Sequence, residues 1–146
     1  MIAFEVQHFL GRARDLLEGM KILVNAEAYI LGENVVQFRH SPALLGIHCA
    51  ISYCDALRIG LGSSKVSSEN HGSATEDLKR CLKGKIESLR GTEHLGNLLA
   101  KKSRIAYAPA MVRENEVEEI VKHAERFALW AEETGKKLKI EGWGDD

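Results

Sequence analysis

The sequence predicts an all-α protein, an up-and-down bundle of five or six helices. Apolar residues recur at three- and four-residue spacing along most of the chain, as they do on the buried face of a helix. No segment shows the sustained alternation of apolar and polar residues that predicts a strand. Only two prolines occur, and each stands where the helical periodicity changes. With 146 residues, of which 45% are hydrophobic, the chain is large enough for one domain with its own core.

The first predicted helix runs from Phe4 to Val24. Its apolar side chains follow helical spacing and leave one face polar, which indicates a helix packed on a core along one side. They are Phe4, Phe9, Leu10, Leu16, Leu17, Met20, Leu23 and Val24. The following stretch, AEAYILGENVVQF, is expected to continue helically and to bend or break at Gly32 and Asn34, because both residues are poor helix formers.

A central helix is predicted in SPALLGIHCAISYCDALRIGLG, with Ser41 as N-cap and Pro42 at the first helical position. The segment ends on Gly60 and Gly62 and is apolar almost all round, so it must be surrounded by other helices. Because it carries ionisable groups at its middle and end, a buried core helix is favoured over a membrane span. We therefore expect no membrane contact.

The second half predicts three more helices. A polar, serine-rich loop leads to SATEDLKRCLKGKIESL, for which Ser73 is the expected cap. The next helix begins on Thr92 and ends before Pro109, and the last runs from an acidic first turn to Gly135. Residues 1–140 are assigned to a single helical-bundle domain. Residues 141–146 are expected to form a short tail, for which both order and disorder stay open.

Cysteine content and the N-terminus predict a cytoplasmic protein. Three cysteines cannot all pair, and Cys49 and Cys54 face different directions on one helix, so reduced thiols are expected. The first residues lack the cationic start and uninterrupted apolar stretch of a secretory signal.

Charge is unevenly distributed, although the net charge is only -1. Residues 78–113 hold nine bases and two acids, and the flanking segments are acidic. Two interpretations stay open. The bases converge on a local anion site, or they form a solvated face that the acidic last helix neutralises.

Three segments carry a resemblance to a known family: the central helix, the loop and helix ENHGSATEDLKRCL, and the lysine-rich helix end KKSRIAYAP before VEEIVKHAERFALWAEE. Together they resemble the HEPN superfamily of small helical bundles. The resemblance implies a bundle of four or more helices and a homodimer. For the function, the resemblance implies one of three alternatives. The protein is a metal-independent ribonuclease, a toxin that acts beside a nucleotidyltransferase-like partner, or a family member that only binds RNA or nucleotides.

The nuclease members carry an arginine followed after four to six residues by a histidine, and this motif is absent. After Arg104 the required positions hold Pro109, Ala110 and Met111. Arg90 and His94 have only three residues between them. Arg104 could still hold a phosphate by a forked contact, with Lys101, Lys102 and Tyr107 beside it. The alternative is that Arg104 pairs with an acid of the last helix and Tyr107 packs in the bundle.

His48, Ser52 and Asp55 form a polar stripe on the central helix and are expected to be a buried structural network. A buried carboxylate needs a cationic partner, and Arg104 or His71 could supply it to Asp55. His71 precedes a predicted helix N-terminus, a position suited to anion contact, although an ordinary surface histidine is the alternative.

No cofactor and no metal are predicted. The chain has no Cys-x-x-Cys, P-loop or dinucleotide glycine signature, and only Glu5 and His8 show the spacing of a di-iron pair. The preferred function is a non-catalytic binding protein for RNA or nucleotide phosphate in a toxin-antitoxin type system. The alternatives are a divergent ribonuclease that uses His71, and a structural or regulatory dimer that binds another protein.

Overall fold

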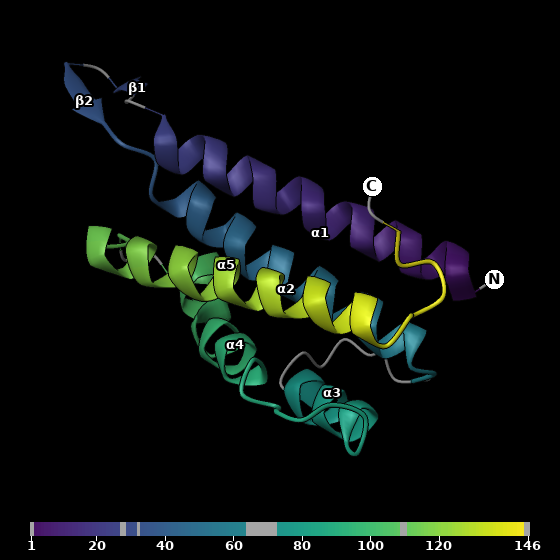
Figure 1. The fold of residues 1–146 in the computed structure, drawn as a ribbon. Coiled ribbons are helices and arrows are strands. Elements are labelled where there is room, and N and C mark those ends of the chain that lie inside the picture. Colours follow the sequence, from purple (N-terminus) through teal and green to yellow (C-terminus); the bar gives the residue numbers. More distant parts are fainter. Residues whose placement is uncertain (1, 27–28, 32, 64–72, 109–110, 145–146) are drawn as a thin grey trace.

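The computed structural model describes residues 2–26, 29–31, 33–63, 73–108 and 111–144 and confirms an all-α bundle (Figure 1). Five helices occur in this described part of the chain. They are α1 (Ile2–Asn25), α2 (His40–Gly60), α3 (Ala74–Leu82), α4 (Thr92–Tyr107) and α5 (Glu114–Lys137).

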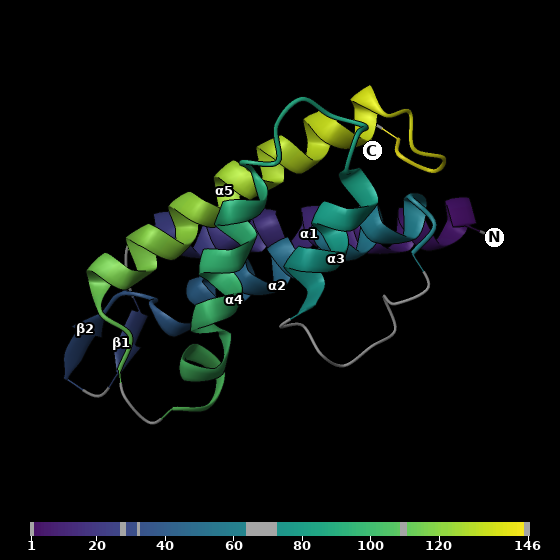
Figure 2. The same ribbon diagram turned by 90° about the horizontal axis from the view of Figure 1, so that it is seen from below.

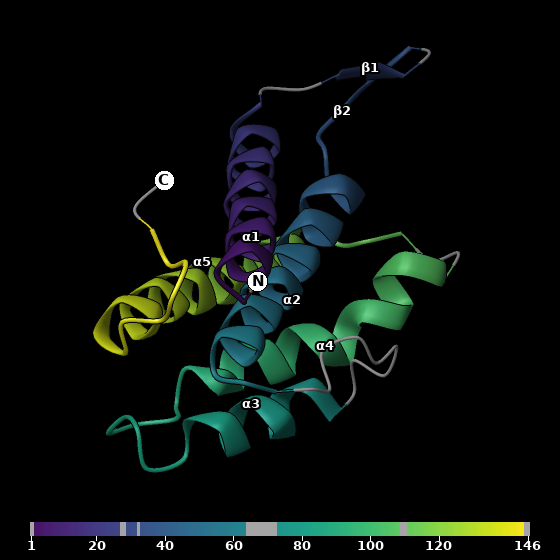
Figure 3. The same cartoon turned by 90° about the vertical axis from the view of Figure 1, so that its right-hand side faces the viewer.

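Helix α2 occupies the centre of the bundle. Helices α1 and α5 pack along it, and α4 and α3 cover its remaining side (Figures 1 and 2). The view along the bundle shows α2 enclosed by the other helices (Figure 3). From Cys49 to Ile59 every side chain of α2 is buried. The nearly uniform hydrophobicity of its sequence therefore matches its position, because a helix that is apolar all round is stable in water only when it is surrounded.

A short antiparallel hairpin connects α1 to α2. Its strands, β1 (Tyr29–Leu31) and β2 (Asn34–Val36), pair Tyr29 with Val36 and Leu31 with Asn34. The prediction that this stretch continues helically is wrong. Aromatic and β-branched residues on both sides of the sequence Gly32-Glu33 favour two extended segments joined by a tight connection, and this preference prevails over helix extension.

Two predicted helix ends also differ from the structure. Helix α2 begins at His40 with Arg39 as its N-cap, so Ser41 lies inside the first turn rather than capping it. Helix α3 ends at Leu82, well before the predicted end, because the chain takes a left-handed conformation at Gly84 (φ +78°). Helix α4 spans the range predicted for it.

The C-terminal residues fold back onto the helices. Ile140 is buried in the core, and the Trp143 ring lies against Gly135, where any side chain would collide with it. The Trp143 Nε1 donates a hydrogen bond to Glu132 Oε1 at 3.1 Å. Of the predicted tail, residues 142–144 therefore contact the helices, while residues 145 and 146 lie outside the described part.

Glycine allows the three longest helices to approach closely at one point. A Cβ placed on Gly46 of α2 would lie 2.9 Å from Met20 Sδ of α1 and 3.3 Å from Ala124 Cβ of α5. Gly11 of α1, in contrast, has no such neighbour within 4 Å. A substitution at Gly46 therefore tests packing, whereas the same substitution at Gly11 tests helix propensity alone.

We expect Gly46→Ala to lower the free energy of unfolding by about 1 to 3 kcal/mol, because the added methyl group overpacks the junction of α1, α2 and α5. The matched change Gly11→Ala should raise it by about 0.5 to 1 kcal/mol, because alanine favours the helix without a clash. Urea unfolding followed by circular dichroism measures both. Equal effects of the two changes would show that Gly46 is not a packing position.

Candidate functional site

Lys101, Lys102, Arg104 and Tyr107 lie in the last two turns of α4, and we call this group the α4 edge. Two of its three cations contact the first half of α5. Lys101 Nζ lies 3.1 Å from Glu119 Oε2, and Arg104 forms an ion pair with Glu116. The Arg104 side chain is still 40% exposed. The acidic last helix therefore neutralises much of the edge, as one of the two interpretations of the charge distribution predicts.

Lys102 and Tyr107 complete the edge. Lys102 makes no ion pair with any residue that the structure describes. Tyr107 is 80% exposed, so the alternative that it packs in the bundle is wrong. Met111, two residues after Pro109, is equally exposed. The exposed ring of Tyr107 lies three residues after Arg104, on the same face of α4.

Glu116 holds the two helix ends together. Besides its ion pair with Arg104, its Oε1 accepts a hydrogen bond from the Arg113 backbone N–H at 3.2 Å, one half of the capping box that starts α5. The same carboxylate therefore fixes the beginning of α5 and the orientation of Arg104.

A histidine pair lies further along the same two helices. His94 Nδ1 of α4 and His123 Nδ1 of α5 are 2.9 Å apart, and His123 Nε2 is 3.7 Å from Glu119 Oε1. Burial, together with the nearby His123, lowers the pKa of His94. The sequence does not indicate this pair, because the two residues are 29 positions apart and belong to no motif.

The predicted network on α2 is only partly correct. Ser52 and Asp55 are buried, at 4% and 8% exposure, but His48 is exposed and is not part of a buried network. Partial loss of hydration and the charge of Lys102 on α4 lower the pKa of His48. The stretch of α2 in which every side chain is buried begins only at Cys49, and His48 lies directly before it.

The cationic partner of Asp55 is Arg58, not Arg104 or His71. Arg58 is only 4% exposed; its Nη1 donates to Asp55 Oδ1 at 3.3 Å and its Nε to Asp77 Oδ2 of α3 at 2.7 Å. Asp77 also accepts hydrogen bonds from Ser63 and Arg80. Burial raises the pKa of Asp55 to about 6, despite the opposing charge of Arg58. His71 lies outside the described residues.

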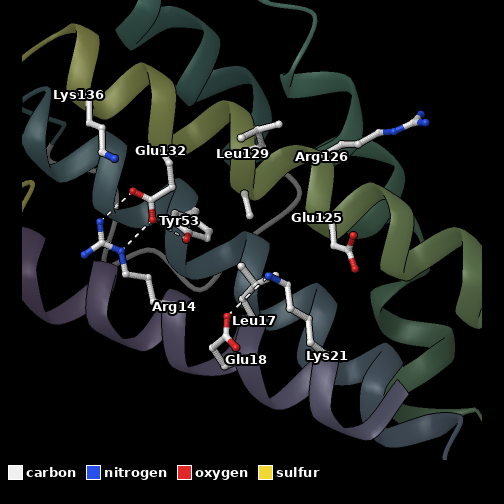
Figure 4. Close-up of a pocket in the computed structure, with 11 residues that line it drawn as sticks. Arg14, Leu17, Glu18, Lys21, Tyr53, Glu125, Arg126, Leu129, Glu132 and Lys136 are labelled. Atoms are coloured by element: carbon white, nitrogen blue, oxygen red, sulfur yellow. Dashed lines mark hydrogen bonds and ion pairs between the residues drawn. The ribbon is translucent and has the colours of Figure 1, made fainter. Parts of the chain in front are cut away.

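A second polar cluster lies between α1 and α5 beside a cavity of about 760 Å³ (Figure 4). Glu132 accepts hydrogen bonds from both Arg14 Nε and the Tyr53 hydroxyl at 2.8 Å, and Figure 4 shows these three groups converging. Although burial opposes ionisation, the hydrogen bonds hold the pKa of Glu132 below its ordinary value. Leu129, 62% exposed, lines the cavity.

Comparison with protein-family models, with curated proteins and with solved structures finds no match to this chain. The likeness to the HEPN superfamily therefore stays a prediction. Among the described residues, no group of three or more side chains is arranged to hold a metal ion, and no helix is long and apolar enough to cross a bilayer.

Asp55→Asn should raise the free energy of unfolding at pH 7.5 by roughly 1 to 2 kcal/mol and give no gain near pH 4. The pKa of Asp55 is about 6 in the folded protein and 3.8 in the unfolded chain, so between these pH values the folded protein binds more protons than the unfolded chain. Asp55 therefore lowers the free energy of unfolding as the pH rises from about 4 to above 6. In the variant, Arg58 still forms its ion pair with Asp77, so its charge is not left unpaired. Urea unfolding at the two pH values, with the exposed Asp15→Asn as control, measures the effect. A loss of stability at pH 7.5 would contradict it.

Proposed function

We propose that the protein is a non-catalytic binding module that holds RNA or a nucleotide at the α4 edge. The observation that supports this most is the 80% exposure of Tyr107, which lies three residues after Arg104 and therefore on the same face of α4. An exposed aromatic ring one helical turn from an arginine offers a stacking surface for a base and a charge for the adjoining phosphate. The burial of hydrophobic side chains during folding does not account for this placement of Tyr107.

The acidic residues of α5 limit the affinity of such binding. A phosphate that approaches Arg104 or Lys101 competes with Glu116 and Glu119, which already contact these cations. Of the three cations of the α4 edge, only Lys102 has no ion pair with a residue that the structure describes. We therefore expect an affinity that is modest and falls steeply with salt, because each phosphate contact releases a counterion.

The proposal excludes catalysis because no histidine stands at the motif spacing after Arg104. In cleavage without a metal, a positioned acid and base transfer protons at the reacting phosphodiester. Arg104 is instead oriented by Glu116, and the phenol of Tyr107 is a poor base at neutral pH. A homodimer, a nucleotidyltransferase-like partner and a toxin-antitoxin role remain predictions of the family resemblance.

A protein partner is the second candidate function. The observation that favours it is the cavity between α1 and α5, where Leu17 and the exposed Leu129 lie among charged side chains. An apolar surface rimmed by charges is typical of a site for another protein. In that case the cations of the α4 edge serve only the contact with α5.

Tyr107→Ala should weaken binding of a uridine oligonucleotide by roughly 5- to 100-fold, the cost of one lost stacking contact, whereas Tyr107→Phe keeps the ring and most of the affinity. Lys102→Gln should lower the slope of log affinity against log salt by about 0.7. Fluorescence anisotropy at 25 to 200 mM salt measures both quantities. Lys83→Gln, an equal charge change after α3, is the control and should leave the slope nearly unchanged. No binding by the wild-type protein at 25 mM salt would reject this function and leave the protein partner.

Glu116→Gln with Glu119→Gln should strengthen RNA binding several-fold, because Lys101 and Arg104 lose the carboxylates that compete with phosphate. Glutamine at position 116 can still accept the hydrogen bond of the capping box, so α5 should stay intact. Glu125→Gln with Glu133→Gln, two exposed positions further along α5, is the charge-matched control. An equal gain in the control would assign the effect to net charge rather than to these two ion pairs.

A further inference from the structure

Glu119 is shared between two cationic groups of different kinds. Its Oε2 contacts Lys101 Nζ at 3.1 Å, and its Oε1 lies 3.7 Å from His123 Nε2. Lys101 belongs to the α4 edge, whereas His123 belongs to the histidine pair. The carboxylate therefore connects an imidazole of the histidine pair to a cation of the proposed ligand site. Lys101 and then His123 lower the pKa of Glu119, so it remains ionised over the physiological range.

The contact between His94 and His123 restricts where protons can reside. At 2.9 Å the two Nδ1 atoms are within hydrogen-bonding distance, and such a bond needs one nitrogen to donate and the other to accept. The pair can therefore carry at most one positive charge while this bond persists. A second proton places two donors opposite each other and breaks the contact between α4 and α5 at this point.

The charged groups around the pair come from both helices. Glu93 lies on α4 beside His94, while Lys122 and Arg126 approach it from α5. Burial, His123 and the two bases lower the pKa of His94, and Glu93 opposes them. The lowered pKa favours the neutral form of His94. On the side of α2, His48 is a separate titratable group that faces Lys102 rather than Glu119.

We propose that protonation of the His94–His123 pair gates the α4 edge by drawing the Glu119 carboxylate away from Lys101 and releasing this lysine for a phosphate group of the ligand. The gate rests on the proposed function, because it regulates that same site. In neutral solution Glu119 neutralises Lys101. In mildly acidic solution the positive charge on the pair competes for Glu119, and the edge gains one available cation. RNA binding then strengthens as the pH falls.

The first test measures binding of a fluorescein-labelled uridine 12-mer from pH 7.5 to 5.5 at constant ionic strength. Uracil does not take up a proton in this range, so the pH dependence reports on the protein. Wild-type protein should bind roughly three- to tenfold more tightly at pH 5.5, the gain expected for one added cation next to a phosphate. His94→Gln with His123→Gln should lose most of this gain.

Two single variants are the controls. His8→Gln removes an exposed histidine of α1 and should keep the full pH dependence. His48→Gln removes the histidine beside Lys102 and should keep most of it. If the pH dependence disappears with His48→Gln and survives in the double variant, the gate at Glu119 is overturned. If RNA does not bind at any pH, the proposed function is overturned and the gate with it, so the two failures are distinguishable.

The second test needs no ligand. The carboxyl carbon of Glu119 is followed by NMR through an acid titration in three proteins: wild type, Lys101→Gln and His123→Gln. If both cations share the carboxylate, each substitution should raise the pKa of Glu119, and the lysine substitution should raise it more. A titration that responds to Lys101→Gln and is unchanged in His123→Gln overturns the gate, whatever the RNA measurement shows. A response to both substitutions supports it.

Discussion

Nearly complete burial of α2 is the constraint on which the rest of the structure depends. A helix without a wet face must be enclosed, so α1, α5, α4 and α3 all pack against it. Burial also forces every polar group on α2 to find a partner inside the protein. Arg58 does so through Asp55 and Asp77, and Tyr53 through Glu132, which connects α2 to α3 in the first case and to α5 in the second.

The contact between α4 and α5 serves structure and the proposed site at once. Glu116 caps α5 and orients Arg104, while Glu119 contacts Lys101 and lies beside His123. Partly exposed ion pairs of this kind contribute less to stability than buried ones, so they can open for a ligand at smaller cost. Buried pairs such as Arg58 with Asp77 cannot, because an unpaired charge in the core costs several kcal/mol. Because of this difference in burial, the cations of the α4 edge can exchange a carboxylate for a ligand, whereas Arg58 cannot.

Much of the fold could be predicted because local periodicity encodes it. The range of α4 and the enclosure of α2 follow from apolar spacing, glycine and proline positions. The hairpin of Tyr29 to Val36 was missed because short extended segments lack a periodic signal. The packing of Trp143 was missed because nothing in its neighbouring residues indicates the space above Gly135. For the candidate site, the sequence indicated the cations and Tyr107 but not which acids of α5 would contact them.

By itself the sequence determined the fold class, the central helix, the concentration of bases in the second half and the absence of the nuclease spacing after Arg104, because each depends on residues close together in the chain. Only the tertiary structure decided that Arg58 is the partner of Asp55, that His48 is exposed, and that His94 meets His123. These outcomes depend on how helices distant in sequence rotate and pack against one another. Local residue spacing carries little information about that rotation, since it is fixed by side-chain packing over the whole bundle.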